Sequence, residues 1–224
     1  MSNFSRREFL RGGTLGLAAL GTGGLILRAD AQVTLKSGHA PRGITPPMLL
    51  AQTEPNIMGP FFRSQAPFRA KITPPLSSGV VMLIQGRVWS FQTKKPIQNA
   101  VLDIWQANAK GRYDNDDPSK PPAPNVFLNR ARLITDESGY YEFETVHPGH
   151  YPLDESRLRP AHIHYRVTHP NHKTLVTQLY FKGDTHIEGD PFVRPSLIIQ
   201  LKEQKIGTGV CERGIFDIVL GAKK

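Results

Sequence analysis

Short runs of apolar or alternating residues, separated by turn-forming residues, occupy most of the chain after residue 78. The clearest turn is the segment 136–139 (Asp-Glu-Ser-Gly), which separates two runs rich in β-branched and aromatic side chains. Runs of this kind at close spacing are typical of strands in sandwiches and barrels. The predicted strands are residues 80–88, 100–106, 131–135, 140–146, 161–168, 175–181, 196–202 and 215–220. No long helical periodicity lies between them, so we expect an all-β fold, an antiparallel β-sandwich, rather than a parallel βαβ fold.

Two long connections stand out between the predicted strands. Residues 108–124 contain four prolines, and residues 147–160 place prolines on both sides of His150 and Tyr151. Long proline-rich connections in a compact β domain often form the walls of a functional site. We therefore expect the sandwich to carry long active-site loops.

The first 31 residues have the features of an export signal. Arg6 and Arg7 are followed by Phe9 and Leu10, then by an apolar run over 12–27 that ends in Ala-Asp-Ala at 29–31. The paired arginines favour the twin-arginine export machinery over an ordinary secretory signal. The run is too short and too glycine-rich for a stable membrane span. We expect a cleaved signal peptide over 1–31, an extended arm over 32–78, a catalytic β domain over 79–224, and a periplasmic or extracellular protein.

Charge and cysteine content narrow the chemistry further. The formal net charge is +9, but no lysine- and arginine-rich block with interleaved aromatic residues is present, so we expect no nucleic-acid partner. The excess of positive charge slightly favours an anionic ligand. Cys211 is the only cysteine, which excludes an internal disulfide and any cysteine-rich metal site.

Two histidines in the segment 159–165 are candidate metal ligands. If residues 161–168 form a strand, His162 and His164 point to the same face and can chelate one ion. The alternative is a polar strand face with two solvated histidines. Imidazole by itself suits zinc, copper, iron or nickel.

Two nearby tyrosines bear on which metal would bind. Tyr151 lies eleven residues before His162, and Tyr113 ends the segment 108–113. A phenol loses its proton near pH 10, at about its pKa, and only a strongly Lewis-acidic cation makes phenolate a ligand at neutral pH. Each tyrosine taken alone is more typical of a core aromatic residue, but two tyrosines with two histidines favour trivalent iron over zinc.

The chain resembles the intradiol ring-cleaving dioxygenases, the family of protocatechuate 3,4-dioxygenase and catechol 1,2-dioxygenase. The similarity is concentrated in five segments, and it keeps the family's order from about residue 59 onward. These segments are 102–113 (LDIWQANAKGRY), 135–143 (TDESGYYEF), 148–152 (PGHYP), 159–164 (RPAHIH) and 177–181 (TQLYF). The resemblance implies an Fe(III) cofactor, a small-molecule catechol substrate, O₂ as co-substrate, and a product of the cis,cis-muconate type.

The resemblance also implies a role for each matched polar side chain. The metal ligands would be Tyr113, Tyr151, His162 and His164. Tyr113 would stay bound, whereas Tyr151 would be displaced when the substrate binds. Arg159 would lie over the substrate ring, and Gln178 would line the pocket beside it.

Two other classes of function remain open at this point. One is a non-catalytic β-sandwich that carries a small molecule, and the other is a zinc or copper enzyme that uses the same histidines. Bound metal and colour distinguish them. The sequence also leaves open which catechol is used (simple, chlorinated, trihydroxylated or carboxylated) and whether the chain forms a homo-oligomer.

Overall fold

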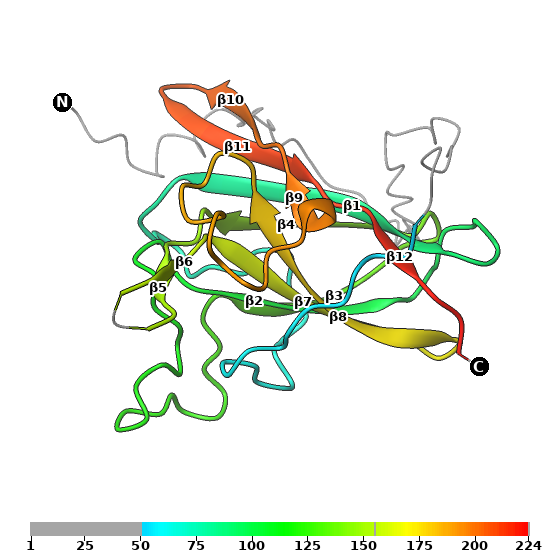
Figure 1. The fold of residues 1–224 in the computed structure, drawn as a ribbon, viewed down its shortest axis with the longest axis horizontal. Helices are drawn as coiled ribbons and strands as arrows, with labels where there is room; N and C mark the ends of the chain where they lie inside the picture. Colours follow the sequence, from blue (N-terminus) through cyan, green and yellow to red (C-terminus); the bar gives the residue numbers. More distant parts are fainter. Residues whose placement is uncertain (1–50, 155, 224) are drawn as a thin grey trace, which may run out of the picture. The chain divides into compact units, whose positions relative to one another are not determined.

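The computed structural model describes residues 51–154 and 156–223, which form two five-stranded sheets and a two-stranded ribbon (Figure 1). The strands are β1 (Val81–Ser90), β2 (Val101–Gln106), β3 (Arg130–Ile134), β4 (Tyr140–Val146), β5 (Tyr151–Pro152), β6 (Leu158–Arg159), β7 (His162–His169), β8 (His172–Phe181), β9 (Ile198–Ile199), β10 (Lys202–Ile206), β11 (Gly209–Ile215) and β12 (Ile218–Leu220). The predicted signal peptide lies outside the described residues.

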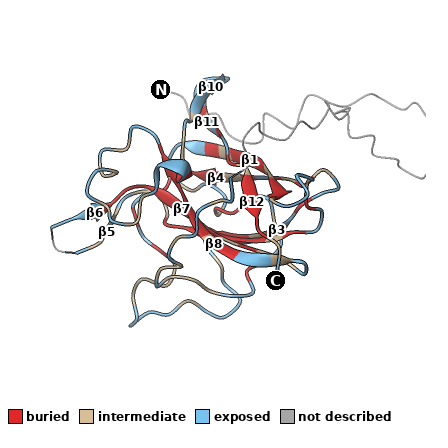
Figure 2. Ribbon diagram, turned by 45° about the vertical axis from the view of Figure 1, so that its right-hand side comes forward, coloured by how far each residue is buried: buried red, intermediate tan, exposed pale blue. Residues whose placement is uncertain are grey.

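The two sheets pack face to face, as the predicted sandwich requires. One sheet has the order β10-β11-β1-β12, with β4 also paired to β1, and the other has the order β3-β2-β7-β8-β9. Alternate residues of β1, such as Met82, Ile84 and Val88, are fully buried in a core that also contains Ile104 of β2 and Ile163 of β7. Figure 2 shows the buried residues along the strands of both sheets, with the connecting loops mostly exposed or intermediate. The all-β sandwich is thereby confirmed.

Two of the predicted strands have different boundaries in the structure. Residues 196–202 divide into the 3₁₀ turn η1 (Pro195–Leu197), β9 and the first residue of β10, because Pro195 fixes a turn at the start. The prediction misses the short strands β5 and β6, all of β11 except Ile215, and all of β10 except Lys202; β10 (KEQKI) is mostly polar and exposed along its length. The run 215–220 divides at Phe216 between β11 and β12, and both strands pair with β1 in parallel. These pairs and β8–β9 are parallel, whereas the other strand pairs are antiparallel.

The sheet that contains β7 is buried on both faces. Its inner face enters the core, and its outer face carries Trp105 and the histidines of β7. Residues 54–62 cover part of this outer face: the Gln178 side chain donates to the Ile57 carbonyl oxygen (2.8 Å), and Phe62 packs edge-on against Trp105. Polar residues on the outer face are therefore shielded from water. Among the described residues, no helix is long and apolar enough to cross a membrane.

The long loop between β2 and β3 is anchored by a buried ion pair. Asp114 and Arg130 each have side chains 1% exposed, and Arg130 Nε donates to Asp114 Oδ1 at 2.7 Å. Arg63 Nη1 donates to the same carboxylate at 2.7 Å. The Asp114 carboxylate therefore neutralises two arginines, Arg130 and Arg63, which belong to separate segments of the chain.

Removing this carboxylate should destabilise the fold strongly. Asp114→Ala leaves the buried Arg130 charge without its main partner, which typically costs about 3–5 kcal/mol. Urea denaturation should show this decrease in the free energy of unfolding. Asp117→Ala on the same loop is the control, because the Asp117 side chain is 39% exposed, pairs with Lys120 at 3.9 Å and accepts hydrogen bonds from Ser119 in its own turn, so its loss should change the stability much less. Equal stability of the two variants would mean that the pair does not anchor the loop.

Candidate metal centre

Two of the histidines of β7, His162 and His164, converge on one point at the outer face of the sheet. His162 and His164 are two residues apart, so their side chains share a face, and their Nε2 atoms lie 3.1 Å apart. Both are buried, at 3% and 1% exposure. Two nitrogens at this separation can bond one ion at the roughly 2.0–2.1 Å typical of imidazole–metal bonds.

The surroundings of the histidines keep the imidazoles neutral, which is the form that binds a metal. His162 Nδ1 lies 2.7 Å from the Pro160 carbonyl oxygen. Since a carbonyl oxygen only accepts, Nδ1 carries the proton and Nε2 keeps its lone pair. Burial, and then the Arg159 charge, lower the pKa of His162 to about 3. Burial and the neighbouring His162 hold the pKa of His164 well below its usual range.

Two tyrosine rings complete a closed group with the two histidines. Tyr113 lies on the loop after β2, and Tyr151 begins β5. Going round the group, ring centroids are 5.6 Å apart for Tyr113–Tyr151, 5.5 Å for Tyr151–His162, 4.7 Å for His162–His164 and 6.3 Å for His164–Tyr113. The structure therefore brings together all four side chains proposed as ligands.

Tyr113 is the most unusual member of the group. Tyr113 is 4% exposed, and among the described residues its buried hydroxyl has no hydrogen-bond partner, which is costly for a polar atom. Burial, and then the nearby Tyr151, raise its pKa well above the ordinary phenol value. The charges of Arg159 and Arg130 favour the Tyr113 phenolate but do not offset burial, so a strongly Lewis-acidic cation bound to the oxygen would be needed to stabilise it. Two phenol oxygens and two imidazole nitrogens thus fit a ferric ion.

Aromatic neighbours fix the orientation of these rings. Phe61 stacks on Tyr113 with centroids 4.2 Å apart, and Trp105 stacks on His164 at 4.8 Å with the planes 5° apart. Trp105 and His164 are also cross-strand neighbours of β2 and β7. The rings of both candidate ligands are therefore held by aromatic stacking.

Arg159 lies beside the four rings as a fixed cation. Its side chain is 1% exposed, and Nη1 lies 3.4 Å from the Tyr151 hydroxyl and 3.4 Å from His162 Nε2. Nη2 donates to Gln178 Oε1 at 3.0 Å, and Gln178 Nε2 donates to the Ile57 carbonyl oxygen at 2.8 Å. Both polar residues predicted beside the metal ligands are therefore next to them.

Two further residues hold Arg159 and are absent from the sequence prediction. Asp190 accepts from Arg159 Nε at 2.7 Å, and the Tyr180 hydroxyl accepts from Nη2 at 3.0 Å. Burial lowers the pKa of Arg159, but Asp190, Tyr151 and Tyr180 together outweigh burial, so the net pKa lies above its ordinary value. The sequence marks Asp190 only by a Gly-Asp-Pro turn, which is common in loops. The sequence could have indicated Tyr180, because this residue lies opposite His162 in the neighbouring strands β7 and β8.

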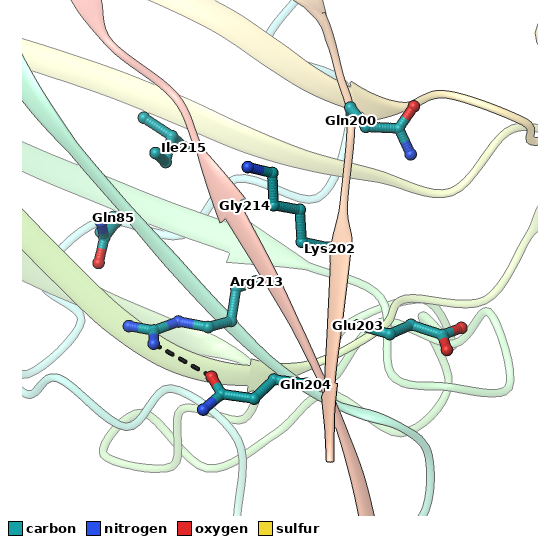
Figure 3. Close-up of a pocket in the computed structure, with 8 residues that line it drawn as sticks. All are labelled: Gln85, Gln200, Lys202, Glu203, Gln204, Arg213, Gly214 and Ile215. Carbon is teal, nitrogen blue, oxygen red and sulfur yellow. Dashed lines mark hydrogen bonds between the residues drawn. The ribbon is translucent and has the colours of Figure 1, made fainter.

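A separate hollow lies on the other sheet, between β10, β11 and β1 (Figure 3). It has a volume of about 390 Å³, and its lining includes Gln85, Lys202 and Arg213. The Arg213 side chain donates to Gln204 Oε1 at 3.2 Å. None of the four candidate ligands lines this hollow, so it is not part of the metal centre.

The sequence is similar to a known protein family and to several curated proteins. The family model described as "Dioxygenase" matches residues 57–222. The intradiol ring-cleavage dioxygenase prcA of Aspergillus niger is 35% identical over 165 residues, which cover 65% of this chain and 51% of that protein. The protocatechuate 3,4-dioxygenase beta chain of Burkholderia cepacia is 37% identical over 139 residues, which cover 60% of this chain and 57% of that protein. The chain thus spans about half the length of the curated relatives it matches.

The fold of the chain is also similar to that of a solved dioxygenase structure. The crystal structure of 3-chlorocatechol 1,2-dioxygenase from Rhodococcus opacus 1CP superposes with a TM-score of 0.70 at 26% identity, over 76% of this chain and 73% of that chain. The match of a family model to most of the chain, together with these relatives, establishes the family. The chain belongs to the intradiol ring-cleaving dioxygenases.

Proposed function

We propose that the protein is a non-haem Fe(III) enzyme that inserts both atoms of O₂ between the two hydroxyl-bearing carbons of a catechol. The observation that carries this proposal is the closed group of Tyr113, Tyr151, His162 and His164 with the unpartnered Tyr113 hydroxyl at its wall. These four side chains would hold the iron. When bound, ferric iron acts as a Lewis acid that binds the catechol oxygens and makes the ring reactive towards O₂.

The two tyrosines differ in a way that suits separate roles. Tyr113 is buried and its ring stacks on Phe61, so it is held in place. Tyr151 is less buried, begins a two-residue strand, and lies within 3.4 Å of Arg159 Nη1. Tyr151 is therefore the ligand that can leave, and its phenolate oxygen can take a proton from a catechol hydroxyl while Arg159 stabilises its charge.

Arg159 would supply the fixed positive charge that the ring-opening step needs. Asp190, Gln178 and Tyr180 hold its guanidinium group, so no reorganisation is required as negative charge builds up on the substrate oxygens. Residues 57–62 cover the same face and keep bulk water away, which strengthens electrostatic interactions inside.

The proposed mechanism is compatible with several kinds of catechol. Relatives act, by their names, on protocatechuate, catechol, chlorocatechol, 6-chlorohydroxyquinol and hydroxyquinol. These rings are the panel to assay with this chain. The positive net charge of +9 slightly favours a carboxylated ring.

We also propose that the protein is exported by the twin-arginine route and works in the periplasm or outside the cell. The support is the Arg6–Arg7 pair with the apolar run that follows it. Mass spectrometry of the protein recovered from the periplasm tests this, and an intact residue 1 in that fraction would contradict cleavage.

Product analysis tests the proposed reaction directly. The iron-loaded protein should convert a catechol from the panel into the corresponding cis,cis-muconate-type diacid, because the bond between the hydroxyl-bearing carbons breaks. With ¹⁸O₂, each new carboxyl group should carry a labelled oxygen. A semialdehyde product, which arises from cleavage beside the hydroxyls, would contradict the proposal.

Replacing the buried phenol should weaken iron binding. Tyr113→Phe removes one phenolate ligand and keeps the ring packed on Phe61, so iron should be lost to a chelator at lower concentration and the visible band should shift. Tyr165→Phe is the matched control, since Tyr165 is a fully buried tyrosine on the core side of β7. Unchanged iron affinity and colour in Tyr113→Phe would remove this residue from the iron ligands.

A glycine beside His164 provides an independent test of the site's geometry. Gly59 has φ +70°, and a Cβ there would lie 3.1 Å from His164 Cε1. Gly59→Ala should cost about 1–2 kcal/mol of stability for the left-handed backbone and should also displace the imidazole and lower iron affinity. Gly207→Ala is the control, because Gly207 has φ +59° with nothing within 4 Å. Chelator competition should show normal iron affinity in the control, and equal affinity in both variants would mean that His164 does not bind the ion.

A further inference from the structure

A second group of metal-binding side chains lies outside the four-ring centre. His150, Asp184 and His186 each place one ligand atom within 4.8 Å of the other two. His150 Nε2 lies 2.9 Å from Asp184 Oδ2, and His186 Nδ1 lies 3.5 Å from Asp184 Oδ1. We propose that these three residues bind a second metal ion, a divalent cation with the chemistry of Zn²⁺, which ties together the loops around the iron site.

The ligand set and its spacing suit zinc. Two imidazoles and one carboxylate, with a fourth position open to water, form a common zinc-binding set. Ligand atoms bonded to one Zn²⁺ at about 2.0–2.2 Å in a tetrahedral arrangement lie roughly 3.3–3.6 Å apart. The separations of 2.9 and 3.5 Å run to different oxygens of the Asp184 carboxylate but are close to this range, so movement of the two histidine side chains towards one of these oxygens would complete the site.

The carboxylate is already oriented by the backbone. Its side chain is 5% exposed, and its oxygens accept the N–H groups of Ala161 (2.8 Å) and His186 (2.8 Å). Outer hydrogen bonds of this kind fix a ligating carboxylate and are a regular part of metal sites. The imidazoles of His150 and His186 are 37% and 31% exposed, so an ion can reach them from solvent.

The surface beside the group also favours a cation. A cavity of about 430 Å³ is lined in part by His150 and Asp184, and its lining contains two further carboxylates, Glu203 and Glu212. Lys182 is the only lysine or arginine in that lining. His147 Nδ1 lies 2.7 Å from Glu212, which adds a second imidazole–carboxylate pair to the same wall. The net negative charge would raise the local concentration of a divalent cation.

The position of the group gives the ion a structural role. His150 immediately precedes Tyr151, and Asp184 holds the N–H of Ala161, which immediately precedes His162. Asp184 and His186 themselves belong to the loop that follows β8. An ion here would therefore connect this loop to the segments that carry two of the proposed iron ligands, and it would stabilise the Tyr151 loop without taking part in the chemistry.

Zinc titration of the iron-loaded protein tests the proposal. The wild-type protein should retain one more equivalent of Zn²⁺ than His186→Ala after gel filtration, as counted by elemental mass spectrometry. Calorimetry should show that the variant binds zinc at this site more than about 100-fold more weakly. Losing a residue that only hydrogen-bonds a metal ligand typically weakens metal binding about 10- to 100-fold, so the larger loss indicates a direct ligand. Zinc should raise the melting temperature of the wild-type protein and leave that of the variant unchanged.

His172→Ala is the matched control. His172 and His169 form another imidazole pair, with Nδ1 atoms 2.9 Å apart, but among the described residues it does not belong to a three-ligand group. This variant should bind zinc like the wild-type protein, and His150→Gln should behave like His186→Ala. Equal zinc retention by the wild-type protein, His186→Ala and His150→Gln would overturn the proposal.

The test does not depend on the iron centre. If the four-ring group did not load iron and took up zinc instead, it would do so in the wild-type protein and in His186→Ala alike. That contribution cancels in the difference between the two proteins. Failure of the iron proposal and failure of the second-site proposal therefore give different results.

Discussion

The alternation of side chains along β7 is the constraint on which the rest of the site depends. Ile163, Tyr165 and Val167 enter the core between the sheets, and that burial fixes the register of the strand. The residues between them must then face the other way, which sets His162 and His164 side by side. A slip of one residue would put two imidazoles into the core and three large apolar side chains on the outer face. Core packing therefore determines the geometry of the metal centre.

Burying this outer face requires a partner for every polar group on it. Most partners are found within the protein: Arg159 is held by Asp190, Gln178 and Tyr180, and Arg130 by Asp114. Among the described residues, the exceptions on this face include the Tyr113 hydroxyl, Trp105 Nε1 and His164 Nδ1, which are buried without a hydrogen bond. Unsatisfied buried polar atoms are rare in native proteins. Of these atoms, the Tyr113 oxygen is the one that a bound cation would satisfy.

The sequence predicted the parts of the structure that depend on local pattern. Alternation identified β1, β4 and β7 to within a residue or two, and strand period alone placed His162 and His164 on one face. The pattern failed for β10, because an exposed edge strand has no buried face to produce an apolar period. Asp190 was missed for a different reason. It lies 31 residues after Arg159 in a loop, and only the folded chain brings the two together. The cover over the site by residues 54–62 depends on tertiary contacts in the same way.

The central claim is that two tyrosines and two histidines form one ferric site. The most direct measurement is the visible absorption spectrum of the purified protein, with iron quantified, before and after anaerobic addition of a catechol. A ferric ion bound by phenolate gives a broad visible band, so the account predicts a coloured protein with stoichiometric iron and a band that shifts when catechol binds. A protein that remains colourless after iron loading would contradict it.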